Sequence, residues 1–204
     1  AHNEAEIALA VAFAQEYPEI VKVLAVGNEA MVKWATSYYV QPSVILKWVT
    51  HLQNLKKEGK LPSDLWITSS DDFASWGGGE AEYHTPDLEA LIKAVDYISM
   101  HTYPYRAKQF AMRQYDSVTN YMKSLGVSKP IHIGETGWAT VSNGFYGPTG
   151  SRATDEYKQG LYYKHLRDWT NEAGISCFYF EAFDERRKDA ANAEGSESHF
   201  GLFT

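Results

Sequence analysis

The chain has little of three things: cysteine, positive charge and long apolar runs. Cys177 is its single cysteine, so no disulfide can form within the 204 residues. Its 19 Lys and Arg residues stand against 26 Asp and Glu residues, giving a net charge of −7, so it offers no basic surface for phosphates. No apolar run approaches the ~18 residues of a membrane-spanning helix, and no signal-peptide pattern opens the chain. We therefore expect no nucleic acid and no membrane as a partner.

Aromatic residues are plentiful, at 14% of the chain, with 6 Trp, 14 Tyr and 9 Phe. Aromatic faces suit the apolar C–H faces of sugar rings, but they also fill protein cores. The content of 44% hydrophobic and 22% charged residues is ordinary for a globular protein, and the length is that of one domain. We find no repeat or linker, and we predict one domain over residues 1–204.

Short apolar strand patterns alternate with helical patterns along the chain. The strand patterns cover 21–26, 65–68, 97–100, 131–133 and 175–180, and the helical patterns cover 3–16, 42–57, 86–94, 108–125 and 154–172. Strands separated by helices form βαβ units, and such units build a parallel sheet. The sequence therefore predicts an α/β fold.

Each predicted strand ends in a group of polar and aromatic residues. These groups are 28–29, 69–71, 101–103, 135–138 and 181–185. In parallel α/β folds, and above all in (β/α)8 barrels, the carboxyl ends of the strands build the active site. The pattern therefore predicts one cleft lined by Glu, Tyr and Trp side chains.

Glutamates at these strand ends suggest glycoside hydrolysis, which needs two carboxyl groups, one protonated and one ionised. Enzymes that retain the anomeric configuration hold the two groups about 5 to 5.5 Å apart. Spacing alone leaves four candidates, Glu29, Glu135, Glu181 and Glu185. The alternative is that each is a solvated loop carboxylate, as most glutamates are. Three strand ends with the same feature favour a site.

Four motifs carry a more specific signal. They are Val26-Gly27-Asn28-Glu29, Tyr103-Pro104-Tyr105, Ile133-Gly134-Glu135-Thr136-Gly137-Trp138, and a closing Phe183-Asp184-Glu185 with Lys188, Glu197 and His199-Phe200-Gly201-Leu202-Phe203. These motifs resemble those of glycoside hydrolase family 17, the β-1,3-glucanases and glucan transglycosylases. They follow the family's order and span nearly the whole chain, so the chain is identified as a member of that family.

The resemblance implies roles for the residues of the first three motifs. Glu29 is expected to be the general acid/base, and Asn28 is expected to bind the sugar 2-hydroxyl near the nucleophile. Glu135 is expected to be the nucleophile that forms a covalent glycosyl-enzyme, with Tyr103 supporting its geometry and charge.

The resemblance also implies a supporting network, and positions at or after the predicted strand ends suggest substrate contacts. Glu185, Lys188 and Glu197 match the family's polar network after the last strand. The expected substrate-binding residues are Trp138, Phe183, Tyr105, His101 and Trp34. For Trp34 and Trp76, stacking on sugar and plain packing are equally compatible with the sequence.

Three further features are predicted to be structural. His132 alternates with apolar neighbours and is expected to be a satisfied strand residue. Cys177 is expected to be buried, and the pair Asp71-Asp72 to be a solvated loop, because no further spaced ligands suggest a cation. We expect no metal and no cofactor.

The resemblance implies a (β/α)8 TIM barrel of which this chain supplies strands four to eight. A complete barrel takes about 250 residues, so the first three strands and their lining Tyr have no counterpart here. An open sheet flank exposes unpaired backbone groups, so we expect the N-terminal part of the barrel as a partner rather than a stable partial barrel.

The sequence therefore predicts a catalytic domain with the activity of a retaining endo-β-1,3-glucan hydrolase that acts by double displacement. A β-1,3-glucan transglycosylase uses the same carboxylates and stays open as an alternative. A glucan-binding fragment without catalysis is a third alternative, against which the presence of both Glu29 and Glu135 argues. β-1,3-Glucan is the expected partner, and because such polymers lie outside most cells, a secreted, periplasmic or cell-surface location is expected.

Overall fold

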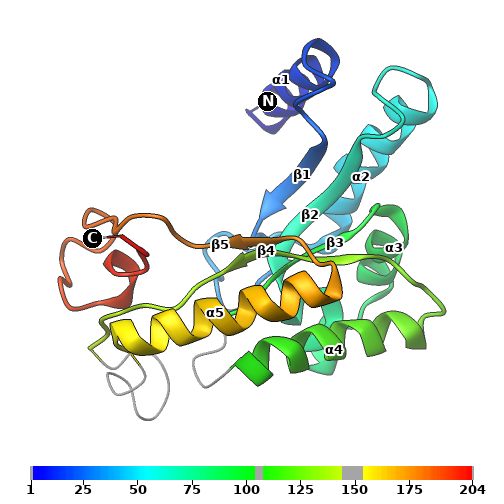
Figure 1. Ribbon diagram of the computed structural model, residues 1–204. Helices are drawn as coiled ribbons and strands as arrows, with labels where there is room; N and C mark the ends of the chain where they lie inside the picture. The colour runs from blue at the N-terminus through cyan, green and yellow to red at the C-terminus, as the bar shows by residue number, and fades with distance from the viewer. Residues whose placement is uncertain (1, 104–107, 144–153, 204) are drawn as a thin grey trace. The chain divides into compact units, whose positions relative to one another are not determined.

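The computed structural model of the chain describes residues 2–103, 108–143 and 154–203. The chain divides into two compact units, one made of residues 1–100 and 117–131, the other of residues 101–116 and 132–204. Its strands form one five-stranded sheet in the order β1-β2-β3-β4-β5 (Figure 1). The predicted α/β fold with a parallel sheet is therefore confirmed.

Helices and strands alternate along the chain as predicted. In order they are α1 (His2–Glu16), β1 (Val23–Asn28), α2 (Pro42–Lys57), β2 (Trp66–Asp72), α3 (Pro86–Ala94), β3 (Ile98–His101), α4 (Lys108–Ser124), β4 (Ile131–Thr136), α5 (Glu156–Ala173) and β5 (Cys177–Tyr179). Short helical segments cover Ala74–Gly78 (η1), Ala81–Tyr83 (η2) and Ser196–Ser198 (η4).

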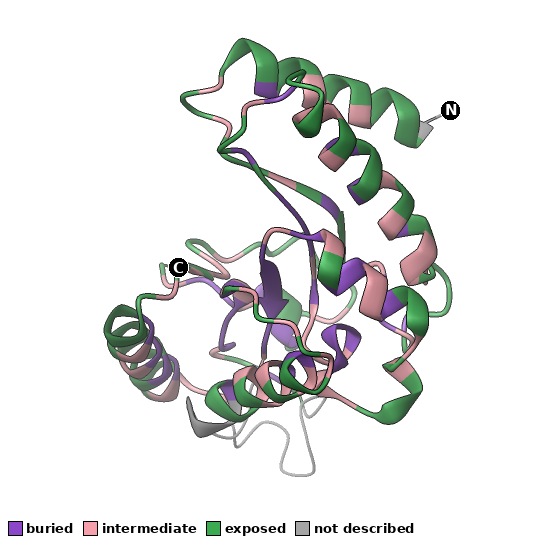
Figure 2. Cartoon of the chain, turned by 90° about the vertical axis from the view of Figure 1, so that its right-hand side faces the viewer, coloured by how far each residue is buried: buried purple, intermediate pink, exposed green. Residues whose placement is uncertain are grey.

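The first unit is built on the parallel pair β1 and β2, in which Leu24 pairs with Ile67. Helix α2 begins at Pro42, whose fixed φ suits the first helical turn, and it packs along β2 and α3. Its buried residues recur at helical spacing and are Ile45, Val49 and Leu52. Buried residues gather on the strands and on the inner helix faces (Figure 2). This core fixes the end of β1, where Glu29 follows.

At the start of β2, Asp96 ties the strand to its neighbours. Its Oδ2 accepts the Ile67 N–H at 2.7 Å and lies 2.7 Å from the Lys56 Nζ. The Asp96 N–H in turn donates to the Ile67 carbonyl at 2.8 Å. A carboxylate that is half-buried and fully paired in this way stabilises the amino end of the strand.

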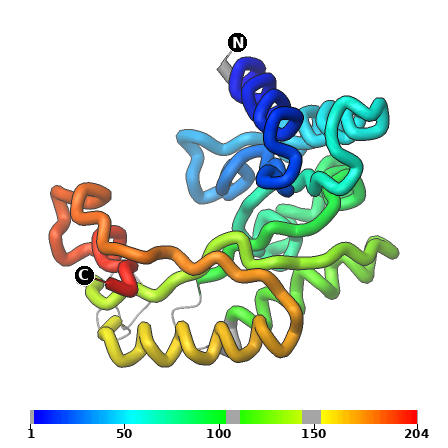
Figure 3. The backbone as a smooth tube through the Cα atoms, turned by 45° about the horizontal axis from the view of Figure 1, so that its top comes forward, coloured from blue at the N-terminus to red at the C-terminus, as the bar shows by residue number. Residues whose placement is uncertain are grey.

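The second unit contains β4, the helix α5 and the parallel strand β5. Helix α5 lies alongside the two strands (Figures 1 and 3). Its Tyr162 and Leu166 form a buried cluster with Trp138, against which Tyr179 of β5 packs. Asp155 caps the start of the helix, because its Oδ1 accepts the Lys158 N–H at 2.7 Å.

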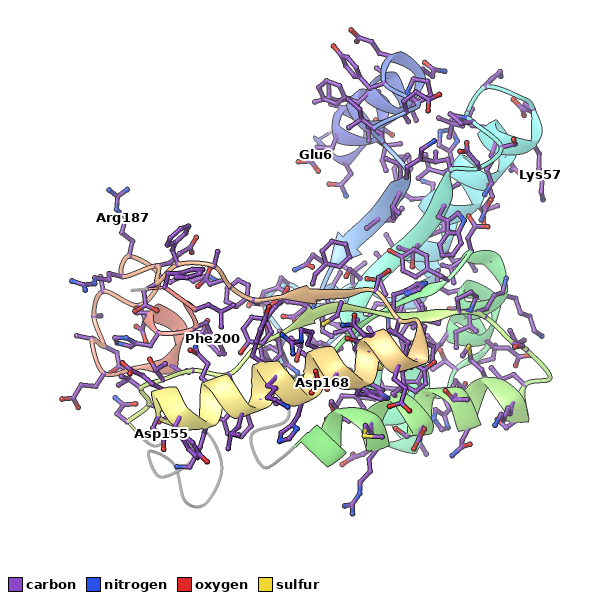
Figure 4. The ribbon with its side chains drawn as sticks, viewed as in Figure 1. Glu6, Lys57, Asp155, Asp168, Arg187 and Phe200 are labelled. Carbon is purple, nitrogen blue, oxygen red and sulfur yellow. The ribbon has the colours of Figure 1, made fainter. Side chains whose placement is uncertain are left out.

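The segment after β5 wraps around one buried aromatic side chain. Phe200 is 2% exposed, and its ring lies edge-on to Phe180 at 5.5 Å and to Tyr103 at 5.7 Å between centroids. Figure 4 shows Phe200 turned into this unit while Arg187 extends away from it. Phe200 of the closing motif therefore anchors the segment that follows β5.

The predicted helices agree with the structure to within about two residues at each end, the usual scatter of helix boundaries. Two strands are longer than predicted: β2 reaches Asp72 and β4 reaches Thr136. The reason is that backbone pairing continues through polar residues, as in the pair Asn28 and Ser70. Polar residues expected in loops therefore lie in the strands themselves.

Among the helices of residues 2–103, 108–143 and 154–203, none is long and apolar enough to cross a membrane.

Candidate active site

The backbone around Glu29 has an unusual conformation. The pairing of β1 with β2 shifts register between Ala25 and Asn28, and Gly27 has a φ of 81°. Glu29 itself has a φ of 47°, in the left-handed region that residues with a Cβ rarely adopt. Such a conformation costs roughly 1 to 3 kcal/mol and persists only where neighbouring contacts impose it.

Those contacts come from the end of β2. The Glu29 N–H donates to the Ser70 carbonyl at 2.9 Å, and the Met31 N–H donates to the Asp71 Oδ2 at 2.8 Å. Asp71 is 0% exposed, so the prediction of a solvated loop was wrong for this residue. Successive strand residues point to opposite faces, and the sequence could not tell which of Asp71 and Asp72 points inward.

The loop after Glu29 is held at further points. The Lys33 N–H donates to the Tyr83 hydroxyl at 3.1 Å, and the Lys33 Nζ lies 4.9 Å from the centre of the Tyr83 ring. The Val40 N–H donates to the Ala30 carbonyl at 2.7 Å, which closes the loop on itself. These contacts therefore hold the loop that follows the candidate acid/base in one conformation.

The two loop tryptophans of the first unit have different environments. Trp34 is 69% exposed, so its ring is available to a ligand. Trp76 is fully buried and donates from Nε1 to the Ser99 carbonyl at 3.0 Å. Trp76 therefore serves packing, whereas the ring of Trp34 is exposed enough to stack on a sugar.

In the second unit, the Glu135 carboxylate has two close neighbours, one of which donates a hydrogen bond to it. The Tyr103 hydroxyl donates a hydrogen bond to Oε1, and the His101 Nδ1 lies 3.7 Å from Oε2. His101 is 1% exposed, whereas the Glu135 side chain is 27% exposed. The Thr102 N–H donates to the Glu135 carbonyl at 3.0 Å, which fixes the strand that carries it. The carboxylate is thus held by a partly buried tyrosine beside a buried histidine, and it remains partly accessible.

The residues just after Glu135 serve packing. A Cβ built on Gly137 would lie 2.1 Å from the Phe180 carbonyl oxygen, so this position of the motif requires glycine. Trp138 is 5% exposed, and its ring centroid lies 5.3 Å from that of Tyr162. Trp138 is thus a core residue, and its burial argues against the predicted stacking on sugar.

The closing motif brings a cation next to an aromatic ring and a carboxylate. The Lys188 Nζ lies 3.9 Å from the centre of the Phe180 ring and 4.0 Å from the Glu185 Oε2. These contacts fall within the range of a cation–π interaction and of an ion pair. Lys188 and Glu185 are therefore close, as expected from the sequence.

Glu181, which the motifs left without a role, lies among these charges. Burial raises the pKa of its carboxyl, Lys188 opposes that rise, and the nearby acidic residues Glu185, Asp184 and Glu197 add to it. Its Oε1 is buried and has no hydrogen-bond partner among the described residues. In the sequence, the place of Glu181 just after the predicted strand 175–180 was its only signal.

The remaining predicted contacts are exposed or undescribed. Asn28 is exposed, and Phe183 is 67% exposed beside Phe203, with 5.8 Å between the ring centroids. The predicted contact Tyr105 lies outside the described residues. Within the described part of the chain, no cluster of three or more His, Cys, Asp or Glu residues could hold a metal ion.

Two residues predicted to be structural have clear surroundings. The Ser176 N–H donates to the His132 Nδ1 at 2.9 Å, and burial lowers the pKa of His132, so it is the satisfied strand residue that was expected. Cys177 is only partly buried, yet burial still raises the pKa of its thiol to about 11. Both belong to the pairing of β4 with β5.

Known proteins resemble this chain in both sequence and structure. An endo-laminarinase from Formosa Hel1_33_131 is 61% identical with a TM-score of 0.93, over 98% of this chain and 59% of that one. A glucan 1,3-beta-glucosidase from Arthroderma benhamiae is 26% identical over 205 residues, 91% of this chain and 59% of the relative. A glycoside hydrolase family 17 β-1,3-glucanosyltransferase from Rhizomucor miehei is 22% identical with a TM-score of 0.64, over 89% of this chain and 59% of that one, and this likeness shows the fold alone.

The chain thus spans 59% of the length of each of these relatives. The solved structures are TIM-barrel glycoside hydrolases, so the predicted correspondence to part of a barrel is confirmed. The predicted resemblance is confirmed as well, at the level of a family-17-like glycoside hydrolase. Because the model of the BtgE/BtgC glycoside hydrolase domain matches residues 1–201, the chain belongs to the BtgE/BtgC glycoside hydrolase domain family.

Proposed function

We propose that the chain carries the catalytic residues of an endo-acting β-1,3-glucan hydrolase of family 17. The environment of Glu135 carries this proposal: a partly exposed carboxylate at a strand end, hydrogen-bonded by Tyr103 and next to a buried His101. The 61% identity to an endo-laminarinase supports β-1,3-glucan as the substrate. Because that polymer lies outside most cells, we also propose that the enzyme is secreted or held at the cell surface.

Glu135 acts as the nucleophile of a retaining mechanism. Its Oε1 is fixed by the Tyr103 hydroxyl, so the carboxylate is held in place before the sugar arrives. Attack on the anomeric carbon forms a covalent glycosyl-enzyme and expels the leaving sugar, and water then hydrolyses the intermediate. The orientation by Tyr103 favours a nucleophile over a merely solvated carboxylate.

Glu29 acts as the general acid and then as the general base. It protonates the leaving oxygen in the first step and takes a proton from water in the second. Asn28 stands beside it and binds the 2-hydroxyl, where hydrogen bonds strengthen in the transition state. The strained backbone at Glu29 supports this role, because such strain concentrates at functional sites.

Substrate contacts are best assigned by exposure. Trp34 and Phe183 are largely exposed, so we propose them as stacking platforms for glucose rings. Lys188, Glu185 and Glu197 form the polar network around Glu181. We assign no stacking role to Trp138, because its ring is buried.

The endo mode of attack is favoured over an exo mode by sequence identity. The glucan 1,3-beta-glucosidase is 26% identical to this chain, against 61% for the endo-laminarinase. Transglycosylation stays the second candidate, because the exposed Trp34 on the loop after Glu29 offers a surface for an acceptor sugar in place of water. Incubation with laminari-oligosaccharides separates the two: products longer than the substrate indicate transfer, and shorter products alone exclude it.

The nucleophile assignment is tested with Glu135→Gln. Loss of the nucleophile removes the covalent route, so turnover of laminarin is expected to fall more than about 10³-fold. Calorimetry with laminarihexaose should still detect binding, because the variant keeps the shape of the side chain. Wild-type turnover in this variant would contradict the assignment.

The support from Tyr103 is tested with Tyr103→Phe, which removes only the hydroxyl that donates to Glu135. Misplacement of the nucleophile is expected to lower kcat by about 10- to 100-fold. The matched control is Tyr163→Phe on α5, a partly exposed residue whose ring packs on Tyr179 at 5.2 Å. Equal activity of the two variants would argue against a role for the Tyr103 hydroxyl.

A further inference from the structure

Asp71 is a fully buried carboxylate at the end of β2 that the proposed mechanism does not use. We infer that Asp71 is the positioning residue of the acid/base Glu29, holding its backbone in the left-handed conformation from which the carboxyl acts. The inference rests on the proposed function, because Asp71 is argued to support the proton transfer that the proposed mechanism assigns to Glu29.

The contacts of Asp71 point to the Glu29 segment. Its Oδ2 accepts the N–H of Met31, two residues beyond Glu29, at 2.8 Å, and its Oδ1 accepts the N–H of Asp72 at 2.9 Å. Both oxygens therefore accept backbone donors. Hydrogen bonds to a carboxylate are roughly twice as strong as neutral ones, and the short buried side chain has little freedom to move. Oδ1 thus binds the backbone of β2, and Oδ2 binds the loop that follows Glu29.

Glu29 needs such a restraint because its conformation is unfavourable. A φ of 47° is unfavourable for a residue with a Cβ, so the backbone relaxes unless both sides are held. The Glu29 N–H to the Ser70 carbonyl holds one side, and Met31 on Asp71 holds the other. A change of φ to the ordinary negative region would redirect the Glu29 side chain and move its carboxyl away from the leaving oxygen.

Asparagine at position 71 would not reproduce this arrangement. Its amide offers one acceptor oxygen, and its NH₂ group would face either the Met31 N–H or the Asp72 N–H, donor against donor. Asp71→Asn therefore weakens the restraint at nearly constant volume.

Asp96, from the segment before β3, provides a matched control because it binds the other end of β2. It too is a carboxylate that accepts a backbone N–H, that of Ile67, and its contacts with Ile67 and Lys56 lie away from the Glu29 segment. Asp96→Asn is thus expected to lower stability without a specific effect on proton transfer. In barrel enzymes the carboxyl ends of strands serve catalysis and the amino ends serve stability.

The experiment uses the dependence of rate on the leaving group, measured in the whole protein. Laminarihexaose expels a poor leaving group and needs a proton from Glu29, whereas 2,4-dinitrophenyl β-laminaribioside expels a phenolate that needs none. For Asp71→Asn we expect kcat/KM on the hexaose to fall about 10²-fold and kcat/KM on the dinitrophenyl substrate to stay within about threefold of wild type. Asp96→Asn should leave the ratio of the two constants unchanged.

Three other outcomes overturn the assignment. Equal losses on both substrates in Asp71→Asn would mean a purely structural role, and unchanged constants would mean no role. Glu29→Gln is the reference: if it shows no leaving-group dependence, the proposed acid/base itself is wrong, which a failure of Asp71→Asn alone does not imply. Thermal melting reports folding, and Asp71→Glu, which displaces the carboxylate by one methylene, replaces Asp71→Asn if the latter does not fold, with the same ratio as its readout.

Discussion

Glu181 lies where its negative charge is unfavourable. One of its oxygens is buried, and the nearby Glu185, Asp184 and Glu197 carry charge of the same sign, which Lys188 opposes. Burial is the largest cause of the raised pKa. The group therefore links proton binding to the stability of the second unit.

The sign of this link leads to a prediction for Glu181→Gln. Because the folded-state pKa is raised above the ordinary value of 4.5, the folded protein binds this proton more tightly, and stability falls as pH rises through that window. The neutral amide removes the penalty, so Tm should exceed that of wild type near about pH 7 but not below about pH 4. Thermal unfolding across this range measures it. A gain of equal size at every pH would point to packing instead of charge.

At the residue scale, the sequence indicated the place of His101 in the candidate site and was wrong about the surroundings of Asp71. His101 was expected near the substrate, and it lies 3.7 Å from the Glu135 carboxylate. Asp71 was expected in solvent and is buried. A motif marks reactive residues, but the partner of a backbone amide 40 positions away is set by tertiary contact.

At the scale of elements, the pairing of β4 with β5 depends on close backbone approach at Gly137. Substitution Gly137→Ala places a Cβ 2.1 Å from the Phe180 carbonyl oxygen, so the segment after β5 must move. We expect a loss of about 1 to 3 kcal/mol or more in the free energy of unfolding, measured in urea. The control is Gly160→Ala within α5, where nothing lies within 4 Å and a gain of about 0.5 to 1 kcal/mol is expected. A neutral Gly137→Ala would show that the contact is easily relieved.

His132 makes the same strand pair sensitive to acid. Its Nδ1 accepts the Ser176 N–H, which a protonated ring cannot do, and burial holds its pKa below 6.5. The folded state therefore binds this proton less tightly, so the stability that His132 contributes is present above about pH 6.5 and is lost as pH falls below it.

His132→Asn tests this dependence, because its side-chain oxygen can accept the hydrogen bond at every pH. Urea unfolding between about pH 5 and pH 8 should show a shallower dependence than in wild type. The same slope in both proteins would assign the acid sensitivity to other groups.

At the scale of the whole molecule, the proposed mechanism fixes the stereochemistry of the product. Two successive displacements at the anomeric carbon return the β configuration, whereas one displacement by water inverts it. A proton NMR time course on laminarin should therefore show the β-anomer first. Initial α-anomer would rule out the covalent intermediate on Glu135 while leaving the family membership intact.

The sequence by itself determined the alternation of strands and helices, the order of the motifs and the identity of the candidate carboxylates. These features are local: apolar periodicity, Pro42 at a helix start, and short runs such as Gly134-Glu135-Thr136-Gly137. Such signals can be read without knowing which parts of the chain meet.

The tertiary structure alone decided which side chains are buried and what they hold. It separated Trp76, which is buried, from Trp34, which is 69% exposed, and it placed Trp138 in the core beside Tyr162. It also turned Asp71 toward the Glu29 loop. The physical reason is that burial and hydrogen bonding depend on neighbours distant in sequence, so two residues with the same local pattern can have opposite surroundings.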